Sequence, residues 1–550
     1  MNREEHVARL QSEAFDLLVI GGGATGTGIA LDAATRNLKV ALVERDDFAA
    51  GTSSRSTKLI HGGVRYLEQA VLRRDRSQFD LVRDALKERA VLLKIAPHLS
   101  QPLPIVMPLY NPLQIPYFFT GLKLYDALAG KANLAPSQFL SAKEIRDRLP
   151  MLRSAGLWGG VLYYDGQFND ARMNVALALT AAEAGVVVAN HVEVVALNKA
   201  NGKLCGATVR DRLSGDSWEI VAKVVINATG PFSDTIRQLD EPSATPMLRL
   251  SSGSHLVLAQ QFSLPTTGIL IPKTEDGRVL FILPWLGHTL VGTTDNSTTL
   301  SADPQASQED IEYILRHLQK YFSIPVTQQD VRAAWAGLRP LVSDPKAADT
   351  AKLSRDHVIN VSNSGLLTIT GGKWTTYRKM ALDTVNAALT LGNLNCDRPS
   401  QTESLKLAGA ENYSAQGDIQ LQTTYGLTPD VATHLNQAYG DRAIQVAELA
   451  REGYGQRLAK NYPYLEAEVV YGAKQEAARS SSDILARRTR LSFLDHQATQ
   501  STLPRVVELL GNTLGWSQAQ QQADLQRSAT ALEVSATATS NLSTAVLNDF

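Results

Sequence analysis

The stretch Phe15–Glu44, FDLLVIGGGATGTGIALDAATRNLKVALVE, decides the fold of the first part of the chain. It begins with an apolar run, Leu17–Ile20, that is short enough for one buried strand. A glycine cluster follows, and small or helix-forming residues then continue to Asn37. A second apolar run, Val40–Val43, ends directly before an acidic residue. This order predicts a strand, a helix and a second strand, the unit that binds dinucleotides in α/β proteins.

The glycines of this stretch form a G-x-G-x-x-G motif at Gly21, Gly23 and Gly26. The first glycine allows a tight turn, the second lets backbone approach a pyrophosphate, and the third lets the helix pack closely on the strand. The N–H groups at the helix N-terminus attract phosphate. Glu44, about twenty residues further on, is placed to accept hydrogen bonds from the ribose hydroxyls of an adenosine. A glycine cluster alone is common in turns, but the complete unit predicts a dinucleotide site.

Length and composition indicate a multidomain globular protein. The chain has 550 residues, of which 44% are hydrophobic and 20% charged, so two or three domains with sizeable cores are expected. A formal net charge of -1, without a long basic run, argues against a nucleic-acid partner. The two cysteines cannot form a disulfide framework or a cysteine-rich metal site, and no metal centre is expected. The sequence shows no signal peptide and no bilayer-spanning stretch, which predicts a cytoplasmic location.

A loop rich in small residues follows the nucleotide unit. Residues 51–57 read GTSSRST and lead into Lys58 and the triplet His61-Gly62-Gly63. Small residues let backbone pass close to a ligand, with hydroxyl and N–H groups directed towards it. The cofactor-binding residues predicted from this loop are Thr52, Ser53, Ser54, Lys58, Leu59 and Gly62.

Three motifs together resemble those of the flavin-dependent glycerol-3-phosphate dehydrogenases, which belong to the D-amino-acid-oxidase-like flavoprotein class. They are IGGGATGTGIALDAATR at 20–36, GTSSRSTKLIHGGVRYLE at 51–68 and GGKWTTYRK at 371–379. The likeness runs from about Phe15 to about Ala498. It implies bound FAD, oxidation of sn-glycerol 3-phosphate to dihydroxyacetone phosphate, and peripheral attachment to a membrane.

The third motif opens a predicted helix after the pair Gly371-Gly372. When hydride arrives at flavin N5, negative charge develops on the N1/C2 side of the ring. A helix N-terminus and Lys373 beside the ring would stabilise that charge. We therefore predict that Gly371, Gly372 and Thr375 contact the cofactor and that Lys373 takes part in catalysis. A glycine turn with a solvated lysine is the alternative interpretation.

The predicted fold class is α/β, with a Rossmann-like FAD-binding domain, an inserted antiparallel-sheet substrate domain and a C-terminal helical domain. Strand-like runs alternate with turns over Leu248–Gly292, and helical periodicity dominates after about Ser400. The predicted division is 12–100, 161–245 and 331–398 for the FAD-binding domain, 101–160 for a cap segment, 246–330 for the substrate sheet, 400–525 for the helical domain, and 526–550 for a disordered tail.

A phosphorylated polyol needs a site for a dianion, and arginine is expected there because its guanidinium binds phosphate through two N–H groups. The candidates are Arg339 in AGLRPL and Arg355 in SRDH. By resemblance, Arg339 and Lys373 lie at the substrate site, and so do Arg65 and Tyr66 from HGGVRY.

Oxidation at C2 of the polyol also requires a base for the hydroxyl proton. His61 is the first choice because it lies in the loop next to the cofactor. His255 in SGSHLVL is the second choice and a predicted substrate contact, although a histidine on a strand is more often a core residue. The predicted catalytic set is therefore His61, Arg339 and Lys373.

Only one dinucleotide fingerprint is present, so electrons are expected to come from the substrate and not from NAD(P)H. The predicted acceptor is a membrane quinone. The alternatives are oxygen as acceptor, a flavin oxidase of another hydroxy or amino acid, and a flavin-binding scaffold without turnover. Contact with the cytoplasmic face of the membrane is predicted through Met107–Leu128, which is rich in Leu, Tyr and Phe and contains Lys123. An ordinary core is the alternative for this stretch, and the oligomeric state, with a homodimer among the options, is left open.

Overall fold

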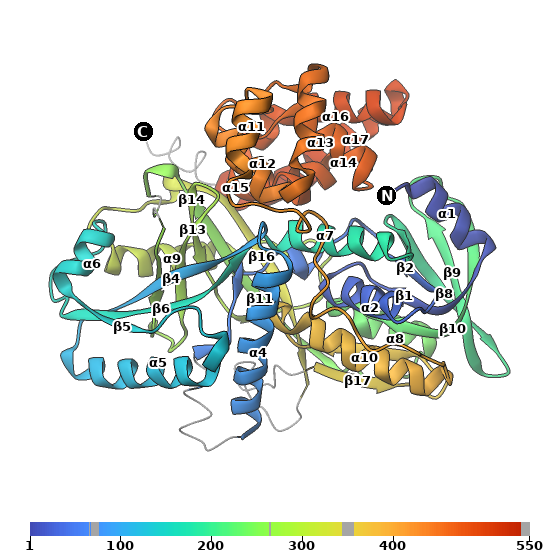
Figure 1. The fold of residues 1–550 in the computed structure, drawn as a ribbon, viewed down its shortest axis with the longest axis horizontal. Helices are drawn as coiled ribbons and strands as arrows, with labels where there is room; N and C mark the ends of the chain where they lie inside the picture. The colour runs from blue at the N-terminus through green and yellow to red at the C-terminus, as the bar shows by residue number, and fades with distance from the viewer. Residues whose placement is uncertain (65–66, 68–75, 263, 265, 344–356, 541–550) are drawn as a thin grey trace, which may run out of the picture.

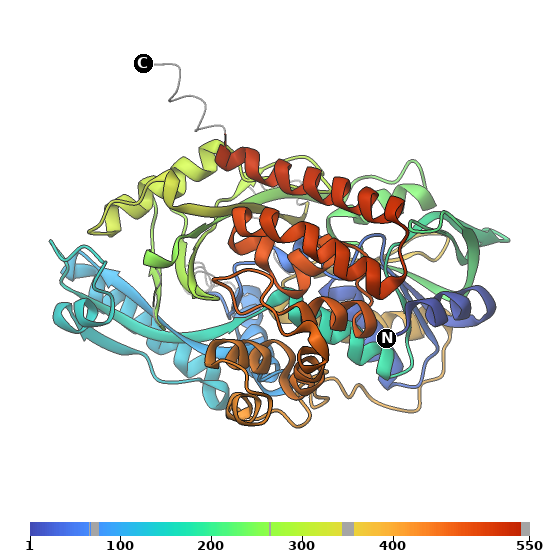
Figure 2. The same cartoon turned by 90° about the horizontal axis from the view of Figure 1, so that it is seen from above.

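The computed structural model describes residues 1–64, 67, 76–262, 264, 266–343 and 357–540. Its described strands form two sheets that lie side by side, and a helical domain covers the region where they meet (Figure 1). From above, the orange and red helices of this domain cross the middle of the molecule (Figure 2). This arrangement of α/β layers with a C-terminal helical domain confirms the predicted fold class.

The first sheet carries the nucleotide unit. Its described strands are β1 (Ala14–Ile20), β2 (Val40–Val43), β7 (Val187–Ala189), β8 (Val192–Ala200), β9 (Lys203–Asp211), β10 (Ser217–Asn227), β17 (His357–Val361) and β18 (Leu367–Gly371). The central order is β17-β18-β10-β1-β2-β7, and β8 and β9 extend from β10. β1 pairs in parallel with β2 and with β10, so the predicted strand–helix–strand unit is confirmed. The apolar residues of β1 and β2 are buried because helices cover the sheet.

Helix α2 (Ala24–Thr35) packs on this sheet at a distance that only glycine allows. A Cβ atom on Gly26 would lie 1.8 Å from the carbonyl oxygen of Gly21. On the other side of the helix, a Cβ on Gly28 would lie 2.7 Å from the ring of Tyr377, at the start of α10 (Tyr377–Gly392). The glycines therefore fix how closely α2 approaches both β1 and α10.

The second sheet is larger and mostly antiparallel. Its described strands are β3 (Leu59–Ile60), β4 (Ser100–Leu109), β5 (Gln138–Ser141), β6 (Gly159–Phe168), β11 (Leu248–Leu258), β12 (Gly268–Ile271), β13 (Leu280–Trp285), β14 (His288–Gly292), β15 (Asn296–Ser297) and β16 (Val331–Val342). The predicted division assigned 331–398 to the FAD-binding domain, but β16 pairs with β11 along its length and belongs to this sheet. The other bounds of the division, except those of the tail, stay predictions.

Helices flank both sheets and build the C-terminal domain. The flanking helices, besides α2 and α10, are α1 (Arg3–Ser12), α4 (Arg76–Ile95), α5 (Ile115–Ala129), α6 (Ala142–Arg148), α7 (Asp170–Glu183), α8 (Ser233–Asp240) and α9 (Gln308–Tyr321). The C-terminal domain contains α11 (Gly417–Tyr425), α12 (Pro429–Tyr439), α13 (Ala443–Leu449), α14 (Glu466–Gln475), α15 (Leu491–Leu494), α16 (His496–Leu514) and α17 (Gln518–Ser540). Among the residues described, no helix is long and apolar enough to cross a membrane.

The predicted disordered tail, 526–550, is wrong over the part that the structure describes. Residues up to Ser540 continue helix α17, which packs along α16. The Ser528 hydroxyl is buried and accepts a 2.7 Å hydrogen bond from Ser481. Small side chains here allow close contact with the rest of the helical domain, so the Ala/Ser/Thr composition does not signal disorder. Residues 541–550 lie outside the described part of the chain.

Candidate active site

One continuous cavity of about 1030 Å³ brings together the two sheets and the helical domain. One wall comes from the glycine loop between β1 and α2, and another from β11 and β16. The loop before α10 and residues of the C-terminal domain complete the lining. Ligand sites in proteins commonly have volumes of about 300–1,000 Å³, so this cavity has room for a dinucleotide together with a small substrate.

The glycine loop is shaped to receive a pyrophosphate. Gly21 has φ of +111°, and a Cβ there would lie 2.7 Å from the carbonyl oxygen of Ala228. Gly23 is the N-cap of α2, and the nearest atom to a Cβ built on it is Ser53 Oγ, at 3.0 Å. The backbone at Gly23 thus faces the cavity without a side chain, and the positive end of the α2 dipole points there.

Glu44 follows β2 and lines the cavity. Its Oε2 accepts a 2.6 Å hydrogen bond from the Gly22 N–H, and its Oε1 accepts one of 2.9 Å from the Asp46 N–H. Burial, and then the neighbouring Asp46, raise the pKa of the Glu44 carboxyl, while the two backbone N–H groups oppose that shift. The carboxylate is therefore fixed to the glycine loop and exposed to the cavity, as a ribose-binding acid must be.

The predicted loop 51–57 joins three parts of the site. Ser53 Oγ accepts a 3.0 Å hydrogen bond from the Ala24 N–H at the start of α2, and Trp374 Nε1 donates 2.9 Å to the Ser53 carbonyl. Thr52 Oγ1 donates 2.7 Å to the carbonyl of Leu338 on β16. The cofactor loop is therefore in direct contact with the strand that carries the predicted substrate residue Arg339.

Arg339, on β16, lines the cavity. Its Nη1 lies 3.2 Å from Asp295 Oδ1, and its Nη2 donates 3.0 Å to Thr293 Oγ1 and 3.0 Å to the Thr294 carbonyl. A Cβ on Gly253 of β11 would lie 2.2 Å from Arg339 Nη2. Packing and hydrogen bonds thus hold the guanidinium in one place, ready to bind an anion.

Both predicted histidines line the cavity, but their surroundings differ. His61 is half-buried, its backbone N–H donates 3.3 Å to Thr375 Oγ1, and its ring meets the edge of Phe281. His255 is buried, stacks on Trp335 at 4.2 Å, and has Nε2 3.0 Å from Thr57 Oγ1. Burial, and then the cations Lys58 and Arg339, lower the pKa of His255 well below its usual range, so its imidazole is neutral.

The segment after β18 also faces the cavity. Gly371, Gly372, Lys373 and Thr375 all line it, and a short helical turn, η8 (Trp374–Thr376), leads into α10. Lys373 therefore stands at the N-terminal end of a helix whose first residues border the site. This is the arrangement that the sequence predicts for stabilising negative charge.

Four of the predicted cofactor residues do not line the cavity: Gly26, Ser54, Lys58 and Gly62. Gly26 acts through helix packing, and the Gly62 N–H donates 2.8 Å to the Tyr125 hydroxyl. Lys58 is fully buried, and its Nζ donates 2.7 Å to Asp170 and 2.9 Å to the Ser54 carbonyl. A buried ammonium needs such partners, so Lys58 supports the loop from behind. Arg65, Tyr66 and Arg355 lie outside the described residues.

The structure adds Arg55 to the site. This residue lies between the predicted Ser54 and Lys58, lines the cavity, and donates 2.7 Å to Asp303 and 3.1 Å to the Ala336 carbonyl. The sequence signal that could have identified Arg55 is a single charged residue within a loop of glycine, serine and threonine. Other missed residues lie in the first sheet and the loop after Glu44, such as Asp47 and His191, and in the C-terminal domain, such as Arg487; no sequence pattern pointed to them.

These features fit FAD. The glycine loop offers open backbone and a helix N-terminus for the pyrophosphate, Glu44 offers a carboxylate for ribose, and the Gly371–Thr375 loop offers a positive helix end at another part of the same cavity.

Comparison with known proteins agrees with this geometry. Residues 16–378 match the FAD dependent oxidoreductase family, which defines the class of protein. Residues 400–521 match the C-terminal domain of alpha-glycerophosphate oxidase.

Individual relatives define the family within that class. The mitochondrial glycerol-3-phosphate dehydrogenase of Mus musculus is 50% identical over 96% of this chain and 74% of its own length. That of Arabidopsis thaliana is 47% identical over 96% of this chain and 87% of its own. A solved glycerol-3-phosphate dehydrogenase from Bacillus halodurans, complexed with FAD, has a TM-score of 0.78 and 32% identity, covering 97% of both chains. The chain belongs to the FAD-dependent glycerol-3-phosphate dehydrogenase family, and the predicted FAD cofactor is confirmed.

Proposed function

We propose that this chain oxidises sn-glycerol 3-phosphate to dihydroxyacetone phosphate in the cavity and passes the electrons to a membrane quinone. One observation carries the first half of the proposal. Arg339, His61 and Lys373 come from distant parts of the sequence, yet they line the same cavity as the glycine loop and Glu44.

Arg339 binds the substrate phosphate in this proposal. Its guanidinium is held against Asp295, so a phosphate dianion, with more charge than a carboxylate, can compete for the same N–H groups. Arg55 and Lys373 line the cavity as well and add positive charge to it. Glycerol lacks the phosphate and would leave Arg339 with its carboxylate partner, which gives selectivity for the phosphorylated substrate.

His61 accepts the proton of the C2 hydroxyl as the C2–H bond breaks and the C2=O bond forms. FAD, when bound, supplies the acceptor for the hydride that leaves C2. Lys373 and the helix end at Trp374–Thr376 then stabilise the negative charge that this transfer adds to the site. His255 is neutral, stacks on Trp335 and contacts the Thr57 hydroxyl. In this proposal, His255 and Thr57 together form the part of the cavity wall that orients the substrate.

Anaerobic mixing with glycerol 3-phosphate tests this chemistry. We expect the flavin absorbance of the loaded protein to bleach, and we expect glycerol at the same concentration to leave it unchanged. Bleaching by both compounds would remove Arg339 from its proposed role, and bleaching by neither would refute the proposed reaction.

The quinone part of the proposal rests on an apolar surface around α5. Leu113, before α5, is 84% exposed, and Tyr117 and Leu124 on α5 are partly exposed. The predicted stretch 107–128 is therefore divided. Met107, Leu109, Leu122 and Tyr125 are core residues, and Phe118 and Phe119 pack against that core. Phe281, whose ring meets His61, packs against the same core, so apolar side chains connect the exposed surface with the cavity.

We propose that the surface formed by Leu113, Tyr117 and Leu124 rests on the cytoplasmic face of a membrane. The test is co-sedimentation of the FAD-loaded protein with liposomes, comparing wild type with a Leu113→Ser/Tyr117→Ser variant. Ile419, which is 55% exposed on α11, offers a matched control as Ile419→Ser. Loss of binding in the double variant alone is expected, and binding by both variants would refute this membrane contact.

A quinone analogue and oxygen should then be compared as oxidants of the reduced protein. Rapid reoxidation by the quinone is expected. Rapid turnover with oxygen and none with the quinone would instead establish an oxidase.

A further inference from the structure

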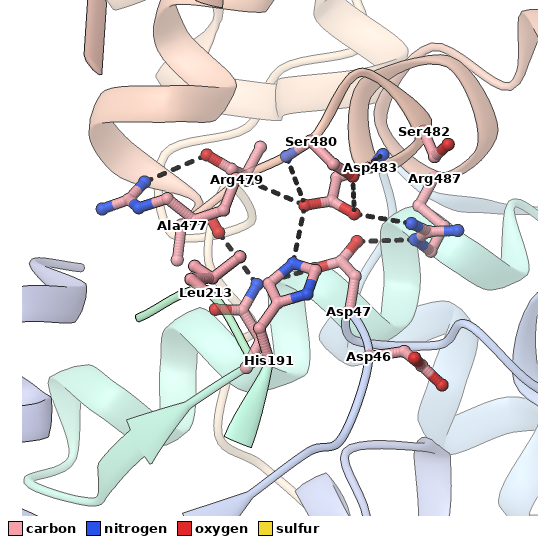
Figure 3. Close-up of polar contacts among 12 residues, drawn as sticks. Asp46, Asp47, His191, Leu213, Ala477, Arg479, Ser480, Ser482, Asp483 and Arg487 are labelled. Atoms are coloured by element: carbon pink, nitrogen blue, oxygen red, sulfur yellow. Dashed lines mark hydrogen bonds and ion pairs between the residues drawn. The ribbon is translucent and has the colours of Figure 1, made fainter. Parts of the chain in front are cut away.

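A segment of the C-terminal domain, Ala477–Arg490, lies directly against the FAD-binding part of the molecule. Figure 3 shows its central residue, Asp483, between His191 on one side and Arg487 on the other. Asp483 Oδ2 accepts hydrogen bonds from His191 Nε2 at 3.0 Å and from the Arg479 and Ser480 N–H groups at 2.8 and 3.0 Å. Its Oδ1 accepts 2.7 Å from Arg487 Nη2. This carboxylate is buried, and its partners come from both domains.

The same segment also holds the loop that follows Glu44. Arg487 Nε donates 2.6 Å to Asp47 Oδ2, and Arg488 donates 2.8 Å to the same oxygen. Asp47 is fully buried and lies three residues after Glu44. The Asp46 carbonyl accepts 2.7 Å from the His191 N–H. The loop is thus fixed by the C-terminal domain through Asp47 and by the first sheet through Asp46.

His191 is itself in an unusual backbone conformation. It lies between β7 and β8 with φ of +55°, in the left-handed region that residues with a side chain rarely occupy. A strained residue persists only where its surroundings fix it, and such positions cluster at functional sites. Here the ring is fixed by Asp483 and the backbone by the loop after Glu44.

These residues do not only connect two domains, because they also line the cavity. Ser480, Ser482, Asp483 and Arg487 belong to its wall, together with Asp46, Asp47, His191 and Glu44. We propose that the C-terminal segment 480–487 is part of the FAD site. It closes the end of the cavity marked by Glu44, and Arg487 acts as a positioning residue that holds the ribose-binding loop through Asp47.

Hydrogen–deuterium exchange on the full-length wild-type protein, with and without FAD, tests this assignment. We expect FAD to slow exchange of peptides covering 480–487 by about 5-fold or more, because backbone at a ligand site opens less often when the ligand is bound. Peptides from α11 and α12, in the same domain but with no residue in the cavity wall, should change little. Equal exchange of 480–487 with and without FAD would overturn the proposal. Equal protection of 480–487, α11 and α12 by FAD would overturn it as well.

A pair of variants separates contact with the cofactor from simple docking of the domains. Arg487→Met leaves Asp47 paired with Arg488, so no buried carboxylate loses every partner. The matched control is Arg172→Met. Arg172 joins α7 to Glu476 of the C-terminal domain, is absent from the cavity wall, and leaves Glu476 paired with Arg488.

The readout is the dissociation constant of FAD from the purified full-length protein, followed by flavin fluorescence. Arg487→Met should weaken FAD binding by about 10-fold or more, and Arg487→Lys should restore part of it. Arg172→Met should bind FAD within about 3-fold of wild type, even if its melting temperature falls as much as that of Arg487→Met. Unchanged FAD affinity in Arg487→Met, or an equal loss in Arg172→Met, would show that the segment only docks the domain.

Discussion

Replacing Gly253 with alanine would place one methyl group against the guanidinium that we assign to the substrate phosphate. The built Cβ lies 2.2 Å from Arg339 Nη2, 2.6 Å from its Cζ and 2.5 Å from Thr293 Oγ1. Ordinary contact begins at about 3.4 Å, so the guanidinium must move by about 1 Å. It cannot keep its 3.0 Å hydrogen bonds to Thr293 and Thr294 after such a shift.

A misplacement of about 1 Å in a site that orients substrate can cost about 100-fold in rate, or about 2.7 kcal/mol of transition-state stabilisation. We expect Gly253→Ala to lower kcat/KM for glycerol 3-phosphate by roughly that factor, mainly through KM. The FAD content should stay near that of wild type, because Gly253 lies on β11 of the second sheet, whereas the glycine loop follows β1 of the first. Steady-state kinetics with a quinone analogue and flavin absorbance of the purified protein provide the two measurements.

Gly268→Ala is the matched control for this prediction. Gly268 lies in the same sheet but not in the cavity wall, and a Cβ there would meet the flexible end of Leu283 at 2.9 Å. A similar loss of kcat/KM in both variants would mean that the sheet, and not Arg339, had been perturbed. A Gly253→Ala enzyme with wild-type kcat/KM would refute the assignment of Arg339 to the phosphate.

Three further predictions concern other parts of the molecule. Gly23→Val should purify with little FAD, because its side chain would occupy backbone that faces the pyrophosphate beside Ser53; full yellow occupancy would contradict this cradle. His61→Asn should slow anaerobic bleaching by glycerol 3-phosphate by about 100-fold, the usual range for loss of a general base, and an unchanged rate would move the role to another group. Burial, opposed by Asp170, lowers the pKa of Lys58 from 10.5 to about 7. Between those values the unfolded chain binds more protons, so the free energy of unfolding should rise with pH by up to about 1.4 kcal/mol per unit, and Lys58→Met should reduce that slope in urea titrations at pH 7 to 10.

The nucleotide unit could be predicted from sequence because its signals are local. Two apolar runs, a glycine turn and an acid lie within thirty residues, and each has one mechanical explanation. The same is true of the helix start at Ser141, where a serine followed three residues later by Glu144 indicates a capping box in the sequence, and α6 contains it. The cavity confirms that residues of all three motifs used for the resemblance meet in space.

Features that depend on distant partners could not be predicted in this way. Residues 163–172, which look like a polar turn, begin as strand β6, and Asp165 is buried there because Arg89 and the Tyr125 hydroxyl pair with it. Lys58 was expected at the cofactor, but Asp170, more than a hundred residues away, draws its ammonium into the interior. Arg487 lies in a segment without a motif, and only the folded structure brings it to Asp47. In each case the decisive partner lies far along the chain.

The interleaving of the two sheets has a consequence for how this protein is made. β10 lies between β1 and β18, and β11 lies beside β16, so each sheet is completed by a strand that the ribosome delivers more than seventy residues later. Until β16 and β18 emerge, the nascent chain carries open strand edges, which attract other chains and need chaperone protection. The parts of the cavity supplied by Gly372–Thr375 and by 480–487 arrive later still. Loading of FAD is therefore expected to follow synthesis of nearly the whole chain.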